Sequence, residues 1–168
     1  MRKTIVIQYT SMIVLCFICG VACYQLFQID QVMQILEIGD RRLLTMDKPS
    51  LLWSVVPFIG ALSVVLFFST HKYLTIIAPI FIAIKVTFFG FSSVFLLVHH
   101  QSVKLYAIWW FPFQLSYCIL LLALYAGSKK PVGRAMRDSS PKKRVLLVII
   151  LLIFLFSLEN FAISYLFK

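Results

Sequence analysis

Two charged side chains stand inside long apolar stretches of this sequence, and they are its first candidates for chemistry. Lys85 lies within FIAIKVTFFG at residues 81–90, and Glu159 lies within SLENF at residues 157–161. A charge at the centre of a lipid bilayer costs about 2.5 to 3.5 kcal/mol on insertion scales, so such a group usually has a partner or a function. The sequence therefore raises the question of what each group binds.

The apolar stretches around these charges are long enough to cross a bilayer. Of 168 residues, 61% are hydrophobic and 13% are charged, whereas soluble domains are about 45–50% apolar and about 25% charged. A spanning helix needs about 20 apolar residues. Five runs meet this requirement, namely residues 4–25, 51–69, 73–98, 105–126 and 145–166. No run alternates like a barrel strand, so we predict an all-α integral membrane protein, a single membrane domain with five transmembrane helices.

Lys85 and Glu159 lie at similar depths in the third and fifth spans. Counted from the first residue of each span, they are about 18 Å and about 21 Å along the helix axis. A lysine side chain bridges this difference, so we predict that the two spans are neighbours and that Lys85 and Glu159 form a buried ion pair. Such a pair would fix helix register. A proton or ion relay is one alternative, and separate snorkelling of the two groups is another.

The distribution of charge predicts the orientation in the membrane. Against a single acidic residue, Asp138, the connection 127–144 holds seven basic residues: Lys129, Lys130, Arg134, Arg137, Lys142, Lys143 and Arg144. Basic loops stay in the cytoplasm, so this loop, with Arg2 and Lys3, places the N-terminus inside and the C-terminus outside. Topology and attraction to anionic lipid headgroups thus explain the net charge of +10, and we expect no nucleic-acid partner.

The segment between the first two spans has a helical pattern of its own. Leu26, Ile29, Met33 and Leu36 follow a 3, 4, 3 spacing, and polar residues occupy the other faces. We predict an amphipathic extracytoplasmic helix over residues 26–38, ended by Gly39-Asp40. Its apolar stripe serves two roles equally well, as an anchor in the outer membrane interface or as a docking surface for a partner helix.

Other polar residues in the spans suggest packing more than chemistry. Asn160 and Gln114 are expected to form hydrogen bonds between helices. Cys16, Cys19 and Cys23 share one helix face, and packing is favoured over a metal or redox site because no histidine or carboxylate lies near them in sequence. Lipidation of Cys23 is a minor alternative to a retained first span.

The outer end of the third and fourth spans is rich in aromatic residues. Trp109 and Trp110 fit an outer aromatic belt. His99 and His100 are expected at the interface, since adjacent histidines on a helix point in different directions.

The sequence has no phosphate loop, nucleophile elbow or metalloprotease motif. We therefore expect no enzyme activity, cofactor or metal.

The last span carries the residues of a family resemblance: Leu158, Glu159, Asn160, Phe161 and Ser164. With the order of spans and loops, this stretch resembles the stage II sporulation protein M family of five-span bacterial membrane proteins. That family has an apolar residue, Glu, a small residue and an aromatic before a Ser or Thr. In the fourth span, where the family has Leu-Pro-His-Gly and then Glu, only Pro112 is kept and Tyr117 stands at the position of the Glu. The chain thus resembles a short, divergent member.

The resemblance implies a non-enzymatic protein of the bacterial cell membrane. Sporulation members work in an envelope complex with peptidoglycan-degrading partners, and short divergent members are similar to proteins encoded with circular bacteriocins, where they serve maturation, export or immunity. One hypothesis is therefore a scaffold or accessory subunit that binds other membrane proteins, a peptide exporter or further copies of itself. The other is a small transporter or exporter with a polar path at Lys85 and Glu159. A dry, satisfied pair favours the scaffold, and a water-filled cleft favours transport.

Overall fold

The computed structural model describes residues 2–44, 51–70, 74–99, 103–128 and 141–166. The described residues are almost entirely helical and contain no strand. The elements are α1 (Arg2–Tyr24), α2 (Ile29–Gly39), the 3-10 turn η1 (Arg41–Leu43), α3 (Leu51–Thr70), α4 (Ile77–Val98), α5 (Val103–Leu105), the π-helical turn η2 (Tyr106–Trp110), α6 (Phe111–Ser128) and α7 (Pro141–Leu166).

Among the described residues, five helical stretches are long and apolar enough to cross a membrane. They are Ile7–Tyr24, Leu52–Ser69, Ile77–Val98, Val103–Ser128 and Lys143–Tyr165. The prediction of an all-helical protein with five helices of spanning length is thus confirmed. Of the predicted basic connection, residues 127–128 end α6 and residues 141–144 begin α7, while residues 129–140 and His100 lie outside the described residues.

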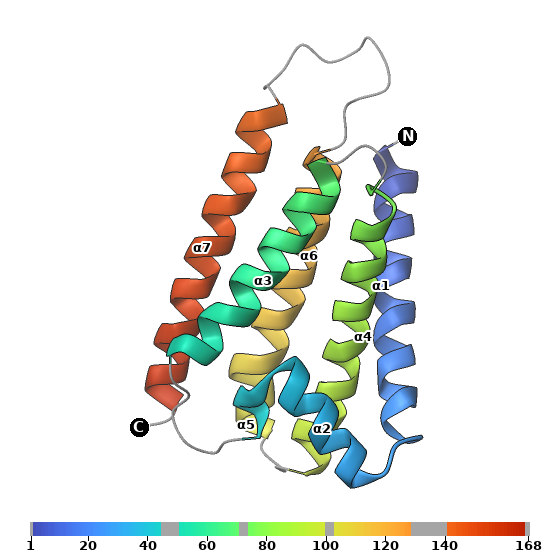
Figure 1. Cartoon of the computed structure of the whole chain (residues 1–168), viewed down its shortest axis with the longest axis vertical. Coiled ribbons are helices and arrows are strands. Elements are labelled where there is room, and N and C mark those ends of the chain that lie inside the picture. The colour runs from blue at the N-terminus through green and yellow to red at the C-terminus, as the bar shows by residue number, and fades with distance from the viewer. Residues whose placement is uncertain (1, 45–50, 71–73, 100–102, 129–140, 167–168) are drawn as a thin grey trace.

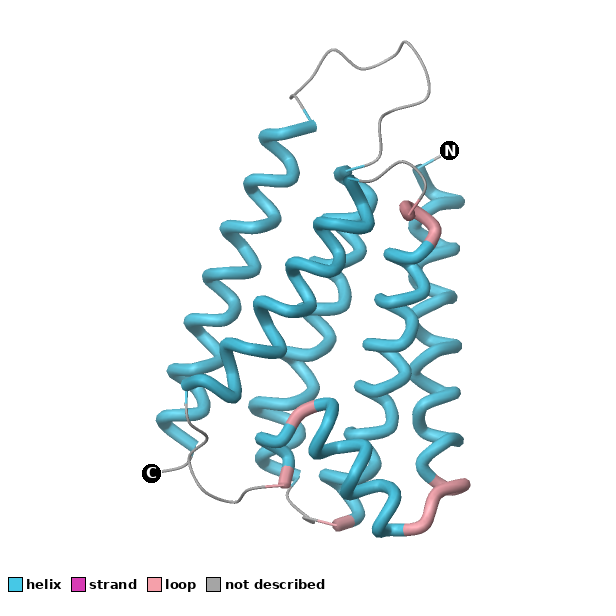
Figure 2. Tube along the Cα trace, in the orientation of Figure 1, coloured by secondary structure: helices cyan, strands magenta, loops and turns pink. Residues whose placement is uncertain are grey.

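The long helices run side by side, and α2 lies at one end of the bundle (Figure 1). The starts of α1 and α7 lie at the opposite end, as the alternating direction of the spans requires (Figure 2). α6 is central because it packs against α3, α4 and α7, whereas α1 packs mainly on α4.

Helix α2 begins at Ile29, three residues later than the sequence suggested, after a capping interaction. The backbone N–H of Gln28 donates to Oε1 of Gln31 at 3.1 Å, and the side chain of Gln28 accepts from the helix in return. Leu26 therefore lies outside the helix and is 81% exposed.

The remaining residues of the predicted apolar stripe differ in burial. Leu36 is buried and packs with Val32, while Ile29 and Met33 are exposed. The buried pair belongs to a cluster that includes Leu43 of η1 and Phe89 of α4. Val32 and Leu36 therefore set the side of α2 that meets the bundle, and Ile29 and Met33 border that side.

Glycines set how closely α1 approaches α4. A Cβ added to Gly20 would collide with the carbonyl oxygen of Thr87, and one added to Gly90 would collide with the carbonyl oxygen of Phe17. Small residues at a helix crossing let the two backbones touch, and this contact supplies much of the association energy in lipid. The two glycines therefore form a reciprocal contact that determines the position of α1.

Replacement of Gly90 by alanine tests this contact. We expect Gly90→Ala to lower the free energy of unfolding by about 1–3 kcal/mol through overpacking, measured by SDS titration in mixed micelles. The matched control is Gly60→Ala in α3, because a Cβ there meets nothing within 4 Å. That variant should be neutral or gain up to about 1 kcal/mol in helix propensity. Equal stabilities for the two variants would contradict the close crossing.

Candidate functional site

The end of α2 turns into the bundle and brings two charged residues with it. Gly39 packs so closely on the ring of Phe88 in α4 that a Cβ would collide with it. Asp40 then leaves the helix in an extended conformation, and its Oδ1 accepts from the backbone N–H of Arg42 at 3.1 Å. This local bond starts η1 and fixes the direction of the Arg42 side chain.

Asp40 and Arg42 form a two-point ion pair. Nε of Arg42 donates to Oδ1 of Asp40 at 2.9 Å, and Nη2 donates to Oδ2 at 2.7 Å. Both side chains are almost completely buried, with 2% and 5% of their surface exposed. The planar guanidinium matches the carboxylate in this geometry, which is the strongest arrangement of such a pair.

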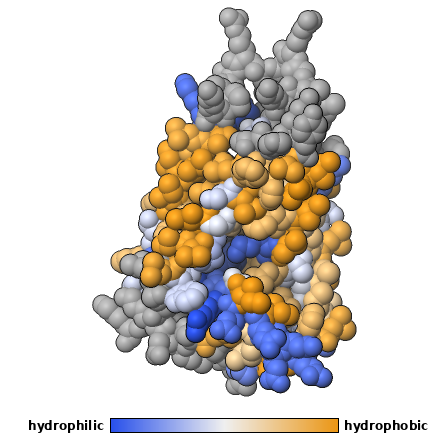
Figure 3. All heavy atoms as spheres, in the orientation of Figure 1, coloured by the Kyte–Doolittle hydropathy of each residue, from blue (hydrophilic) through white to orange (hydrophobic). Residues whose placement is uncertain are grey.

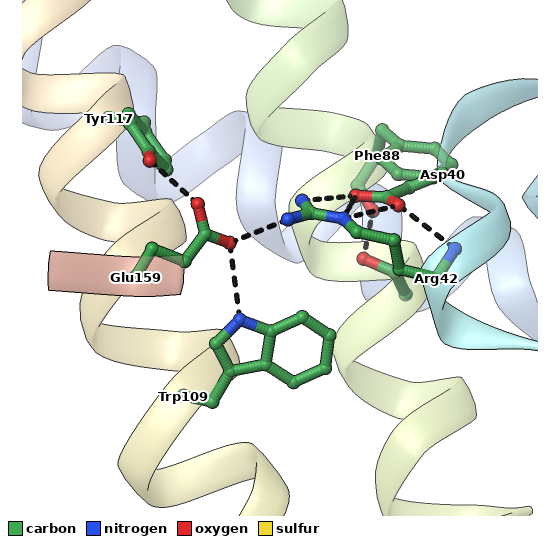
Figure 4. A network of polar contacts seen from close by, with 7 residues as sticks. Asp40, Arg42, Phe88, Trp109, Tyr117 and Glu159 are labelled. Atoms are coloured by element: carbon green, nitrogen blue, oxygen red, sulfur yellow. Dashed lines mark hydrogen bonds and ion pairs between the residues drawn. The ribbon is translucent and has the colours of Figure 1, made fainter. Parts of the chain in front are cut away.

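The remaining Nη1 of Arg42 donates to Oε1 of Glu159 in α7 at 2.9 Å. Two further donors complete the environment of this carboxylate: Nε1 of Trp109 lies 3.1 Å from Oε1, and the hydroxyl of Tyr117 lies 2.6 Å from Oε2 (Figure 4). Glu159 is 1% exposed. Donors from η1, η2 and α6 thus converge on one buried carboxylate of α7.

Arg42 stays charged in this environment. Burial disfavours its charged form, but the hydrogen bonds and negative charges of Asp40 and Glu159 outweigh the burial and raise the pKa of Arg42. The guanidinium also lies 5.7 Å from the ring centre of Trp109, within the range of a cation–π contact. The three charged groups together carry a net charge of −1.

Lys85 lies near this network but does not join it by direct contact. A small cavity of about 30 Å³ is lined by Arg42, Lys85 and Glu159, together with Ser54, Gln114 and Tyr117. Among the described residues, Glu159 forms its ion pair with Arg42, and none forms one with Lys85. Arg42 therefore takes the position that the sequence analysis assigned to Lys85.

The packing of the helices explains this difference. Lys85 and Glu159 line the same cavity, as their similar depths in the spans predicted. The predicted ion pair also required direct contact between their two helices. α7 packs mainly on α6, and α4 packs mainly on α1 and α6. α6 thus contacts both helices, and the end of α2 supplies a longer, planar cation that reaches Glu159.

The two polar residues expected between helices behave differently. Nδ2 of Asn160 donates to the carbonyl of Phe156 at 2.8 Å, so this side chain bonds within its own helix. Gln114 is buried and lines the cavity, but no hydrogen bond between helices is found for its side chain among the described residues. The contacts that join helices here come from Trp109 and Tyr117 instead.

The tryptophans expected in an outer aromatic belt lie inside the protein. Trp109 and Trp110 are each 1% exposed, and their rings meet edge to face at 5.5 Å. The cause is η2, because a π-helical turn changes the direction in which successive side chains point. The ring of His99 stacks on the ring of Phe95, with 5.0 Å between the ring centres.

Sequence reasoning missed Asp40 and Arg42 as site residues. Asp40 entered only as part of a helix stop, and Arg42 was assigned no role. One sequence pattern could have indicated this ion pair: an aspartate stands two residues before an arginine, directly after a helix with one apolar face. Trp109 was assigned to the interface because aromatic residues near a span end usually lie there.

The arrangement holds charge in place and leaves little freedom for reaction. Both carboxylates of the network accept several hydrogen bonds. Within the described residues, no group of three His, Cys, Asp or Glu side chains could hold a metal ion. The geometry is that of a fixed polar contact between an irregular segment and three helical elements.

No protein-family model, curated protein or solved structure matches the chain.

Removal of single members of the network should have unequal effects. Arg42→Met leaves two buried carboxylates without their cation, so we expect a loss of about 3–5 kcal/mol in unfolding free energy. Glu159→Gln leaves the Asp40–Arg42 pair intact, and a loss of about 1–3 kcal/mol is expected. SDS titration in mixed micelles measures both.

The control is Glu37→Gln, which breaks only the exposed contact of Glu37 with Arg41 at 4.0 Å. Exposed pairs contribute about 1 kcal/mol or less, so this variant should be close to wild type. An Arg42→Met protein as stable as the Glu37→Gln control would show that the buried network does not hold the fold together.

Proposed function

We propose that this protein is a non-enzymatic membrane scaffold or accessory subunit of a cell-envelope complex, and that α2 is its docking element. The observation that carries the proposal is the satisfied state of Glu159, which accepts hydrogen bonds from Arg42, Trp109 and Tyr117. A carboxylate with its acceptor positions filled is suited to hold a structure and poorly suited to move a proton or bind a substrate.

The exposed apolar side chains of α2 support a docking role. Val32 and Leu36 are buried against the bundle, while Ile29, Met33 and Ile38 remain exposed on the helix. An apolar helix face held in a fixed orientation binds another helix at a lower entropic cost than a mobile segment. The same exposed residues would suit an outer membrane interface, where α2 would be an amphipathic helix.

The charge pattern supports an orientation for this surface. With Arg2, Lys3 and the basic connection in the cytoplasm, α2 is extracytoplasmic and the C-terminus lies on the same outer side. In a bacterial cell membrane this places α2 toward the envelope. The residues that resemble the stage II sporulation protein M family favour a sporulation-type complex, or one for bacteriocin maturation, export or immunity.

Transport is the second candidate, and one observation favours it. Lys85 lines both the small cavity beside Glu159 and a larger pocket of about 370 Å³ between α2, α3 and α4. Pro57 and Ala61 also line both, so the two spaces meet at the level of Lys85. A small exporter would use this connection as a polar path.

Site-specific photo-crosslinking in native membranes tests the docking proposal. A photoreactive amino acid at Met33 should yield a discrete protein adduct, because this apolar side chain is exposed on α2. The control position is Phe154 of α7, which is 60% exposed on a span and should label lipid. Protein adducts of equal yield at both positions, or none at Met33, would contradict a docking role for α2.

Purified protein in sealed vesicles separates the two candidates. The scaffold predicts no flux of protons, ions or peptide above that of empty vesicles. Flux that is lost on substitution of Lys85 or Glu159, with retained stability, would instead support the exporter.

A further inference from the structure

A pocket on the surface between α2, α3 and α4 is not explained by the docking proposal. Its volume is about 370 Å³, and its walls are mainly the apolar side chains Val56, Phe81, Ile84 and Phe88. Glu37, Asp40, Arg41 and Lys85 are the charged residues of its lining. Figure 3 shows hydrophilic residues in the lower part of this face, with hydrophobic residues above and beside them.

Lys85 is the unusual member of this wall. Among the described residues, none forms an ion pair or a hydrogen bond with its ammonium group. It lies eight residues into α4, about 12 Å from the start of the helix. An ammonium at this depth is costly without a hydrogen-bond acceptor in direct contact with it. The pocket beside it is open to such a group.

The wall residues also suggest what else the ligand contains. Aromatic and aliphatic side chains on α3 and α4 match an acyl chain, because burial of apolar surface is favourable and has no directional requirement. A water-soluble anion would leave this surface uncovered. An amphiphile from the bilayer satisfies both the apolar wall and Lys85.

The charges around the pocket decide between classes of amphiphile. The cations Arg41, Arg42 and Lys85 are matched by three carboxylates, those of Glu37, Asp40 and Glu159. An anionic ligand would add one uncompensated charge in a region of low dielectric constant, which costs several kcal/mol. A zwitterionic headgroup adds none, and it offers a phosphate to Lys85 and an ammonium to an acidic residue.

We propose that this pocket binds a zwitterionic phospholipid of the surrounding bilayer. Its phosphate accepts a hydrogen bond from Lys85, and its ammonium lies toward Glu37, which is 57% exposed. One acyl chain follows the apolar wall formed by α3 and α4. Arg41, whose guanidinium lies 5.0 Å from the ring centre of Trp53, borders the headgroup. Ile38, one of the exposed residues of α2, also lines this pocket, so the site borders the docking surface.

Photolabelling of the full chain in nanodiscs tests the site. The probe is phosphatidylethanolamine with a diazirine on one acyl chain, and the labelled residues are mapped by mass spectrometry. We expect adducts to concentrate on the pocket wall, at Val56, Phe81 and Ile84, relative to the exposed span residue Phe154. Even labelling of these positions would overturn the proposal.

Variants then test the role of the ammonium. Lys85→Met should lower labelling of the pocket about tenfold, the value of one charge-assisted hydrogen bond. Lys104→Met, which removes an exposed cation elsewhere, should leave labelling unchanged. If Lys85→Met is too unstable to purify, Lys85→Arg keeps the cation and should retain labelling at the pocket. Unchanged labelling in Lys85→Met, or loss in Lys85→Arg, would overturn the assignment.

Competition with unlabelled lipids in the wild-type protein tests the headgroup. Phosphatidylethanolamine should displace the probe from the pocket more strongly than phosphatidylglycerol or a neutral diacylglycerol does. Stronger displacement by phosphatidylglycerol would contradict the charge argument, and equal displacement by all three would show that only the acyl chain is bound.

Discussion

Arg42 lies between two carboxylates from distant parts of the chain, and the burial of both depends on it. Asp40 holds the guanidinium at two points, and Glu159 accepts its remaining edge at 2.9 Å. Removal of a cation from such a network leaves charge in a region of low dielectric constant, where water cannot stabilise it. The position of α2, the turn at η1 and the inward direction of Trp109 are all linked to this contact.

The role of this contact follows from what lipid demands of an irregular backbone. Non-helical segments at membrane depth are tolerated only where they are covered by protein or line a cavity. The end of α2 meets that condition because Gly39 packs on Phe88 and Leu43 is buried. The polar network and the apolar cover therefore support each other. Lys85 lines the small cavity too, and it also lines the larger pocket between α2, α3 and α4 that we propose as a lipid site.

Much of the fold could be predicted from composition, because each span had to supply about 20 apolar residues. The polar site could be predicted only in part. The depth of Glu159 and Lys85 in their spans brought both to one cavity, but periodicity says nothing about which helices touch. Arg42 could not be assigned to Glu159 because it lies in a connecting segment that folds back into the bundle. Trp109 points inward because of a π-helical turn, which no local sequence pattern predicts.

Hydrogen–deuterium exchange of α2 in nanodiscs tests the central claim most directly, namely that the Arg42 network holds α2 on the bundle. In Arg42→Met, the backbone amides of residues 32–39 should exchange much faster than in wild type. Those of α4 and α6 should keep their protection, and Glu37→Gln should match wild type throughout. Unchanged protection of residues 32–39 in Arg42→Met would contradict the claim and would leave the position of α2 to its apolar contacts alone.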